Sequence, residues 1–192
     1  MRKIVFNSND IPPQMFIGVI TAIVAFFPAM AANSLAVVFG GKYPMDGGRT
    51  LGGKRILGDG KTWSGLIGGV VAASLVGVSF GFFVDSLYPT EMYGFWVVFP
   101  LSLGALLGDI CSSFFKRRSG RERGVRTPLI DEYDFVLGAL ILTFIVQPKW
   151  VLDTFVYREG WMSLLVILIL IPVLHRGTNI IGYKIGMKKE PW

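Results

Sequence analysis

The residues best suited to chemistry are three carboxylates at the edges of apolar segments. Asp109 lies inside one long apolar run, and Asp131 and Asp134 stand at the start of the next. Carboxylates are costly at membrane depth and usually mark a functional site there. Three of them together could hold Mg²⁺, which takes oxygen ligands and completes its shell with substrate phosphates and water. The alternative is a set of ion pairs with the basic residues between the two runs. A soft-metal site is excluded, because the chain has one Cys and one His.

The spacing of these residues predicts two polar helix faces. In a helix of about 3.6 residues per turn, Asp109, Ser113 and Lys116 share one face. Asp131 and Asp134 share a face on the first turns of the next helix. Two antiparallel helices would bring both faces together. Mg²⁺ on the carboxylates, with Ser113 and Lys116 on phosphate oxygens, would suit phosphoryl or nucleotidyl transfer.

A second candidate site is the segment 40–62, which is rich in glycine and carries basic residues at intervals. Glycine lets backbone N–H groups turn toward an anion and approach it closely. Residues 58–62 faintly resemble a Walker A loop, but the spacing of its first glycine and a preceding strand are missing. A flexible linker is the other interpretation. If the segment binds nucleotide or phosphate, the candidate residues are Lys42, Asp46, Gly47, Arg49, Lys61 and Thr62.

Composition places these residues in a membrane protein. Hydrophobic residues make up 52% of the chain and its mean hydropathy is +0.55, and a membrane-spanning helix needs about 20 mainly apolar residues. We predict an all-α integral membrane protein that is a single domain over residues 1–192, with about five transmembrane helices. Their expected ranges are 11–39, 63–88, 94–115, 129–146 and 161–183, and the loops 40–62 and 116–128 are expected to form the active site.

The distribution of Lys and Arg predicts the orientation of the chain in the membrane. Of the 19 such residues, 15 fall in the two loops and in the tail after His175. Positive charge accumulates on the cytoplasmic side. We therefore expect a multi-pass protein of the cell membrane, with its N-terminus outside, its C-terminus in the cytoplasm and its active site facing the cytoplasm. The same charges could instead serve only topology and attraction to anionic lipid headgroups.

Polar residues in the remaining apolar segments give weaker signals. Asn33 is a candidate nucleotide ligand, or else forms a hydrogen bond in helix packing. If the last helix continues to about residue 183, His175, Arg176 and Asn179 would face a cavity or the lipid phosphate. A shorter helix would leave His175 and Arg176 at the membrane interface. Small residues at a four-residue stride in 63–88 predict close helix packing and no chemistry.

Several stretches of the chain resemble one enzyme family. "GDICSSFFKR" followed by Asp131-x-x-Asp134 is similar to the signature of the CTP-dependent phosphatidate cytidylyltransferases, the CDP-diacylglycerol synthases. The Gly-His-Gly-Gly segment of that signature is absent, and the spacing from Lys116 to Asp131 is shorter. The chain resembles the archaeal branch, the CDP-archaeol synthases, over almost its whole length. The stretches that carry this resemblance are "PAMAANS", "MDGGR", "ILGDGKTWSG" and "LHRGTNIIGYKIGMKKEPW".

This resemblance implies transfer of CMP from CTP to an isoprenoid ether-lipid phosphate, giving CDP-archaeol and pyrophosphate. Mg²⁺, or Mn²⁺ in its place, would be held by Asp109, Asp131 and Asp134. Lys116, Lys61 and Arg49 would neutralise the pyrophosphate, whereas Arg117 and Arg121 should behave as surface charges. The expected partners are CTP, the lipid phosphate and the bilayer, with no nucleic acid; a homo-oligomer is left open. A polyprenol-type lipid kinase and a small transporter are the alternatives.

Overall fold

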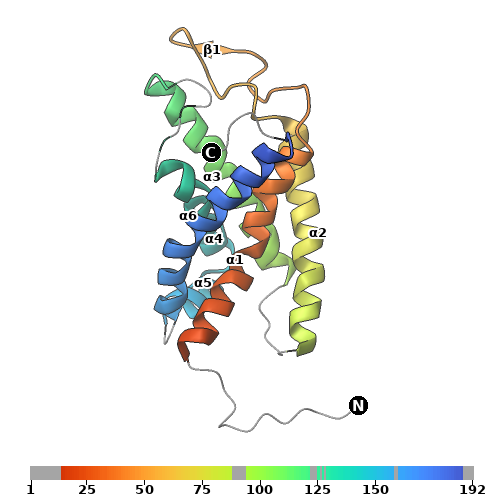
Figure 1. Ribbon diagram of the computed structural model, residues 1–192, viewed down its shortest axis with the longest axis vertical. Helices are drawn as coiled ribbons and strands as arrows, with labels where there is room; N and C mark the ends of the chain where they lie inside the picture. The colour runs from red at the N-terminus through yellow and green to blue at the C-terminus, as the bar shows by residue number, and fades with distance from the viewer. Residues whose placement is uncertain are drawn as a thin grey trace.

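The chain forms a bundle of helices with one small hairpin at its end (Figure 1). The computed structural model describes residues 14–87, 94–121, 125, 127, 129–157 and 160–187. The elements are α1 (Gln14–Val38), β1 (Thr50–Leu51), β2 (Lys54–Arg55), α2 (Trp63–Leu87), α3 (Phe95–Arg118), α4 (Ile130–Val146), α5 (Pro148–Phe155) and α6 (Gly160–Lys184). The antiparallel strands β1 and β2 pair Thr50 with Arg55 and Leu51 with Lys54.

Within the described residues, helices occupy all five segments for which the sequence predicts them, and positions 11–13 and 88 of the expected ranges lie outside the described part of the structure. α3 continues past the expected end at residue 115 to Arg118. Three helical stretches of the described chain are long and apolar enough to cross a membrane, and a shorter apolar stretch lies in α1; they are Trp63–Phe83, Phe95–Arg118, Gly160–Lys184 and Ile23–Val38. The protein is therefore helical and suited to a membrane, while the number of crossings stays a prediction.

The short helix α5 and the hairpin were not predicted. Pro148 suits the first turn of a helix, where its missing N–H is not needed. Val151 and Phe155 lie one turn apart on α5 and are both buried. A segment of eight residues is too short to show a helical period clearly. Two-residue strands leave even less of a pattern.

The main core is formed by α1, α3, α4, α5 and α6. The rings of Phe26 in α1 and Phe155 in α5 pack edge to face with centroids 5.7 Å apart. Phe135 of α4, Leu101 of α3 and Ile167 of α6 are buried in the same cluster. Large apolar side chains are exposed on the outer faces of the helices, as expected for a protein whose surroundings are lipid.

Glycines let two pairs of helices approach closely. On α2, a Cβ on Gly69 would lie 3.0 Å from the Cβ of Ala36 in α1, so the predicted packing role of the small-residue stride is confirmed. Between α3 and α4, a Cβ on Gly104 would lie 2.5 Å from the carbonyl oxygen of Gly138, and one on Gly108 would collide with the carbonyl of Asp134. The backbones of α3 and α4 are thus in near contact beside the carboxylates.

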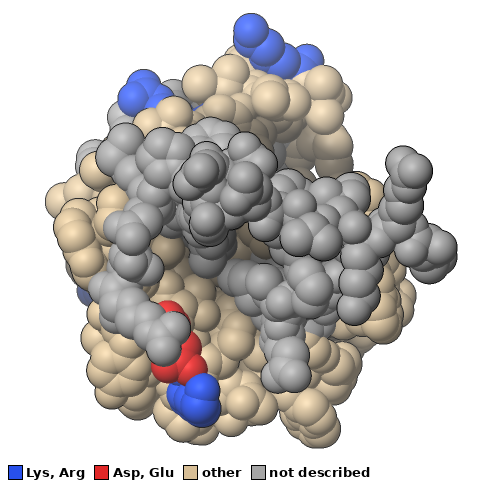
Figure 2. Space-filling view, turned by 90° about the horizontal axis from the view of Figure 1, so that it is seen from below, with Lys and Arg blue, Asp and Glu red and all other residues tan. Residues whose placement is uncertain are grey.

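The two ends of the bundle differ in character. Residues 40–62, the end of α3, the start of α4 and the end of α6 gather at one end, which we call the loop end (Figure 1). The opposite end, near α5, is shown in Figure 2, and its described surface carries few charged side chains. The fold thereby collects residues from distant parts of the sequence at the loop end.

Candidate active site

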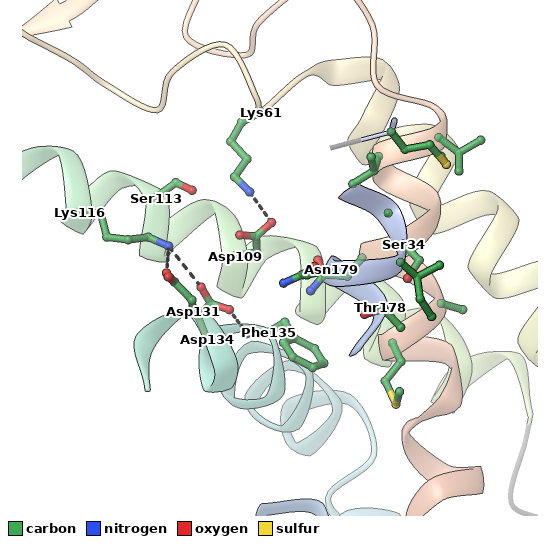
Figure 3. A pocket seen from close by; sticks show the side chains of 18 of the residues that line it. Ser34, Lys61, Asp109, Ser113, Lys116, Asp131, Asp134, Phe135, Thr178 and Asn179 are labelled. Carbon is green, nitrogen blue, oxygen red and sulfur yellow. Dashed lines mark hydrogen bonds and ion pairs between the residues drawn. The ribbon is translucent and has the colours of Figure 1, made fainter. Parts of the chain in front are cut away.

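A cavity of about 630 Å³ lies at the loop end, between α1, α3, α4, α6 and the segment 40–62. One wall is charged and comes from Lys61, α3 and the start of α4; the other is mainly apolar and comes from α1 and α6 (Figure 3). The charged wall consists of Lys61, Asp109, Ser113, Lys116, Arg117, Asp131 and Asp134. The cavity therefore offers both a polar and an apolar surface to one ligand.

Each of the three aspartates in the cavity is close to a lysine (Figure 3). The ammonium group of Lys116 lies 2.7 Å from an oxygen of Asp131 and 3.8 Å from an oxygen of Asp134. Lys61 reaches down from the segment 40–62 and pairs with Asp109 of α3. The pairs of Lys116 are of the kind that the sequence left open as an alternative to a metal site, whereas the pair of Lys61 with Asp109 was not predicted. The described structure also brings all three predicted carboxylates to one cavity.

Local hydrogen bonds in the first two turns of α4 fix its two aspartates. The N–H of Thr127 donates to Asp131 Oδ2 at 2.6 Å, and the N–H of Asp131 donates to the carbonyl of Thr127 at 3.0 Å. Asp134 Oδ1 accepts the N–H of Phe135 at 2.7 Å. The carboxylate of Asp131, in the first turn, is favoured because a helix N-terminus is electropositive. Leu129, just before the helix, has a φ of +68°, a left-handed conformation that stores strain in residues other than glycine.

The segment 40–62 is folded around Asp46. The N–H groups of Leu57 and Gly58 donate to Asp46 Oδ2 at 3.0 and 2.9 Å, and the N–H of Gly48 donates to Oδ1 at 3.1 Å. The guanidinium of Arg55 lies 2.7 Å from the same carboxylate. Arg55 and then these backbone donors hold the pKa of Asp46 far below its usual range. The segment is therefore an ordered loop, and the flexible-linker interpretation was wrong.

Thr62 connects this loop to α2. Its hydroxyl oxygen accepts the N–H of Gly65 at 3.1 Å and that of Gly41 at 3.3 Å. The first of these contacts is an N-cap, which satisfies a free donor at the start of a helix. Because Lys61 directly precedes this cap, its side chain projects from a fixed point into the cavity.

The cavity collects many of the predicted site residues and leaves others outside. Those that line it are Asn33, Lys61, Asp109, Ser113, Lys116, Asp131, Asp134 and Asn179. Those of the described chain that do not are Lys42, Asp46, Gly47, Arg49, Thr62 and Arg176. The side chain of His175 lies outside the described part of the structure. Asp46 and Thr62 have clear roles in folding the loop, and their roles toward a nucleotide stay predictions.

Comparison with known proteins identifies the family. The family model described as CarS-like CDP-archaeol synthase matches residues 15–192. The chain belongs to the CDP-archaeol synthase family. It is 47% identical over 177 residues to the CDP-archaeol synthase of Methanosarcina mazei, covering 86% of this chain and 99% of that one. It is 44% identical over 183 residues to the CDP-archaeol synthase of Halobacterium salinarum, covering 91% and 97%.

The family assignment agrees with the fold. A solved structure described as an intramembrane enzyme for archaeal membrane lipids biosynthesis is similar, with a TM-score of 0.64 and 36% identity. The match covers 84% of this chain and 94% of that one. The expected relation to the CDP-archaeol synthases is therefore confirmed, and this chain is a membrane-embedded helical member of the family.

The metal-binding capacity of this family member can be judged from its donor atoms. In the described residues, no three His, Cys, Asp or Glu side chains are arranged to hold one metal ion. Mg²⁺, however, is usually bound by only one or two protein carboxylates and takes its remaining ligands from phosphates and water. Asp109, Asp131 and Asp134 offer oxygen donors of the right kind on one cavity. The donors fit Mg²⁺ chemically, provided that the lysines move to another partner.

The sequence did not identify Ser34, Thr178 and Arg117 as residues of the cavity. Ser34 of α1 and Thr178 of α6 line the cavity, as Asn33 and Asn179 do, and Figure 3 shows both with Asn179. Their polarity at membrane depth was the available signal. Arg117 was expected to be a surface charge, which was wrong. It lines the cavity and donates from Nε to the carbonyl of Leu57 at 3.4 Å. Its contact lies 60 positions away in the sequence, which no local pattern reveals.

Proposed function

We propose that this protein makes CDP-archaeol and pyrophosphate, by transferring CMP from CTP to an isoprenoid ether-lipid phosphate. Family membership supports the reaction class. The observation that carries the assignment to this site is the cavity with two unlike walls. The phosphates of a nucleoside triphosphate suit the lysines of the charged wall, and the tails of a lipid phosphate suit the apolar side chains of α1 and α6. A single cavity with both surfaces suits a reaction between the two.

The chemistry requires no nucleophile from the protein. A phosphate oxygen of the lipid attacks the α-phosphorus of CTP, and the bond from that phosphorus to the departing pyrophosphate breaks. A phosphate monoester is already largely ionised at neutral pH, so a general base is not needed. The protein contributes alignment of the two substrates and stabilisation of developing charge.

Lys61 and Lys116 are the charge-stabilising groups of this proposal. Both ammonium groups line the cavity and are bound to carboxylates in the described structure. When CTP enters, they exchange these partners for phosphate oxygens, and the hydroxyl of Ser113 donates a further hydrogen bond. Other predicted ligands are proposed to support the substrates, and of these Asn33 and Asn179 line the cavity. For the nucleotide these are Asn33, Lys42, Gly47 and Arg49, and for the lipid phosphate they are His175, Arg176 and Asn179.

The carboxylates left by the lysines are the proposed metal ligands. Asp109, Asp131 and Asp134 would hold Mg²⁺, or Mn²⁺ in its place. When bound, the ion would supply positive charge against the phosphates of the nucleotide. The exchange keeps the carboxylate charges of the cavity compensated, because each carboxylate always has a cation beside it. The three side chains are held for this role by α3 and by the hydrogen bonds at the start of α4.

The proposed reaction is tested by following both ends of CTP. Purified protein is given CTP labelled at the α- or the γ-phosphate, with Mg²⁺ and either an ether-lipid phosphate or the matching lipid alcohol. We expect the α-label to enter the lipid phosphate and the γ-label to leave as pyrophosphate. Transfer of the γ-label to the lipid alcohol would establish a kinase instead. No labelled lipid in any mixture would reject both enzymes.

We further propose that the protein is multi-pass and that its cavity faces the cytoplasm. The support is the distribution of basic residues and the gathering of the two basic loops at one end of the bundle (Figure 1). The test uses a Cys111→Ser background with single cysteines at Lys42 or Arg121. An impermeant maleimide should label both only from the cytoplasmic side of membrane vesicles. Labelling from the outer side would reverse the orientation.

A further inference from the structure

One guanidinium joins the loop 40–62 to the end of α3. Arg118, the last residue of α3, donates from Nη2 to the carbonyls of Lys54 and Arg55, at 3.1 and 2.7 Å. Its Nη1 donates to the carbonyl of Leu51. All three acceptors belong to the β1–β2 hairpin. The guanidinium also lies over the ring of Phe114, 5.5 Å from its centre, which favours one orientation of the side chain.

The hairpin depends on such polar contacts for its position. Leu51 and Lys54 are exposed, so little apolar burial holds the strands against the bundle. Arg118 fixes the hairpin by hydrogen bonds instead, since the planar guanidinium of an arginine can donate to several carbonyl oxygens at once. A lysine at this position has a single ammonium group and could not serve three acceptors in the same fixed geometry.

The hairpin is linked in turn to the residue that enters the cavity. The carbonyl of Arg55 accepts from Arg118, while its side chain pairs with Asp46. Asp46 accepts from the N–H of Gly58, and the carbonyl of Gly58 accepts from the N–H of Lys61 at 3.3 Å. A continuous set of hydrogen bonds therefore runs from the end of α3 to the backbone of Lys61.

We propose that Arg118 is a positioning residue that holds the loop 40–62 over the cavity, so that Lys61 meets the carboxylates and the phosphates of the nucleotide. Arg118 does not line the cavity, and it acts through Lys61. The inference rests on the proposed function insofar as the nucleotide is CTP. The docking of the loop itself can be tested without any substrate.

The docking test is limited proteolysis. Trypsin cleaves after Lys54 and Arg55, the residues whose carbonyls accept from Arg118. Releasing these carbonyls should accelerate cleavage at both bonds in Arg118→Ala, because proteolysis follows the population of the opened state. Arg121→Ala removes an exposed arginine from the same region and is the matched control. Fragments identified by mass spectrometry give the rate at each bond.

The functional test is kinetic. In Arg118→Ala we expect the KM for CTP to rise about tenfold or more, the usual effect of losing hydrogen bonds to a charged group. The KM for the lipid phosphate and the melting temperature should stay near those of the wild type. The KM for CTP of Arg118→Lys should lie between those of the wild type and of Arg118→Ala. If the alanine variant does not fold, Arg118→Lys is used for the test instead. In a Lys61→Ala background, Arg118→Ala should add little, since two residues that act as one unit are not additive.

Each outcome decides a separate point. Unchanged cleavage after Lys54 and Arg55 in both Arg118 variants would overturn the docking role. Faster cleavage with an unchanged KM for CTP, or fully additive effects with Lys61→Ala, would overturn positioning through Lys61. Wild-type protein that forms no labelled lipid from CTP would refute the proposed function, while the cleavage rates would still test the docking.

Discussion

The α3–α4 pair and the loop 40–62 bring charges to the same cavity but are held by different forces. α3 and α4 meet backbone to backbone at Gly104, Gly108 and Gly138, next to the buried side chain of Phe135. The loop is held by hydrogen bonds and ion pairs centred on Asp46 and Arg118. Close packing resists displacement, whereas a hydrogen bond adds only a small net stability, because water can replace either partner when the loop opens.

This difference predicts separate roles for the α3–α4 pair and the loop 40–62. The carboxylates of α3 and α4 stand on packed helices and should keep their geometry whether or not a substrate is present. Lys61 stands on a loop that polar contacts hold, and we expect it to exchange Asp109 for a phosphate of the nucleotide, as proposed above. The comparison predicts that changes in the helix pair act on turnover and stability together, and changes in the loop act mainly on affinity for CTP.

The largest effect is expected from Asp109→Asn, Asp131→Asn and Asp134→Asn. Removing a preorganised charge-stabilising group typically costs about 10²–10³-fold in rate, and loss of a metal ligand should cost at least that. Glu132→Gln, on the same turn of α4 but outside the cavity lining, should keep its activity. Turnover at several Mg²⁺ concentrations is measured beside the melting temperature. Asn variants that are less stable yet active per folded molecule would show that the carboxylates serve only as ion-pair partners.

The next largest effect is expected from Gly108→Ala. The added methyl group meets the carbonyl of Asp134, so α3 and α4 must separate, at a typical cost of about 1–3 kcal/mol for overpacking. Both the melting temperature and turnover should fall. The control is Gly177→Ala in α6, where a Cβ meets no atom within 4 Å. Equal melting temperatures for the two variants would contradict the rigid helix pair.

A smaller effect, confined to the loop, is expected from Asp46→Asn. The variant loses its pairing with Arg55, so the KM for CTP should rise about tenfold with little change in melting temperature. The control is Asp59→Asn, which removes the more exposed partner of Arg55.

The pH dependence of this effect can also be predicted. Because the pKa of Asp46 is lowered, the contribution of its carboxylate is present above the usual Asp pKa of about 4 and is lost only at lower pH. The difference in CTP affinity between wild type and variant should therefore be constant from about pH 8 to 5; a difference that shrinks within this range would speak against the assignment.

The smallest effect is expected at the opposite end of the bundle. Lys149 and Asp153 form an exposed ion pair on α5 at 2.5 Å. Exposed pairs of this spacing contribute roughly 0.3–0.5 kcal/mol, so Lys149→Ala should leave turnover unchanged and barely alter the melting temperature. A marked loss of activity would show that function is not confined to the loop end.

Much of the site could be predicted from residue types and helical spacing. Asp109, Ser113 and Lys116 share a helix face in the sequence, and the structure places all three on the cavity. The interior of the loop 40–62 could not be predicted, since Asp46 draws its partners from positions 48, 55, 57 and 58. The contact of Arg117 with Leu57 could not be predicted for the same reason, since the two residues are far apart in the sequence. Such pairs leave no periodic trace in the sequence.

The sequence alone determined the surroundings of this protein, the positions of its longer helices and the residues suited to its chemistry. Apolar runs of membrane length require helices, because only a helix satisfies its own backbone hydrogen bonds in lipid. Only the tertiary structure decided which lysine meets which aspartate, and that Arg118 belongs to the loop as much as to α3. Those pairings depend on how closely α3 and α4 pack and on where the loop folds back, which are distances between residues far apart in the chain.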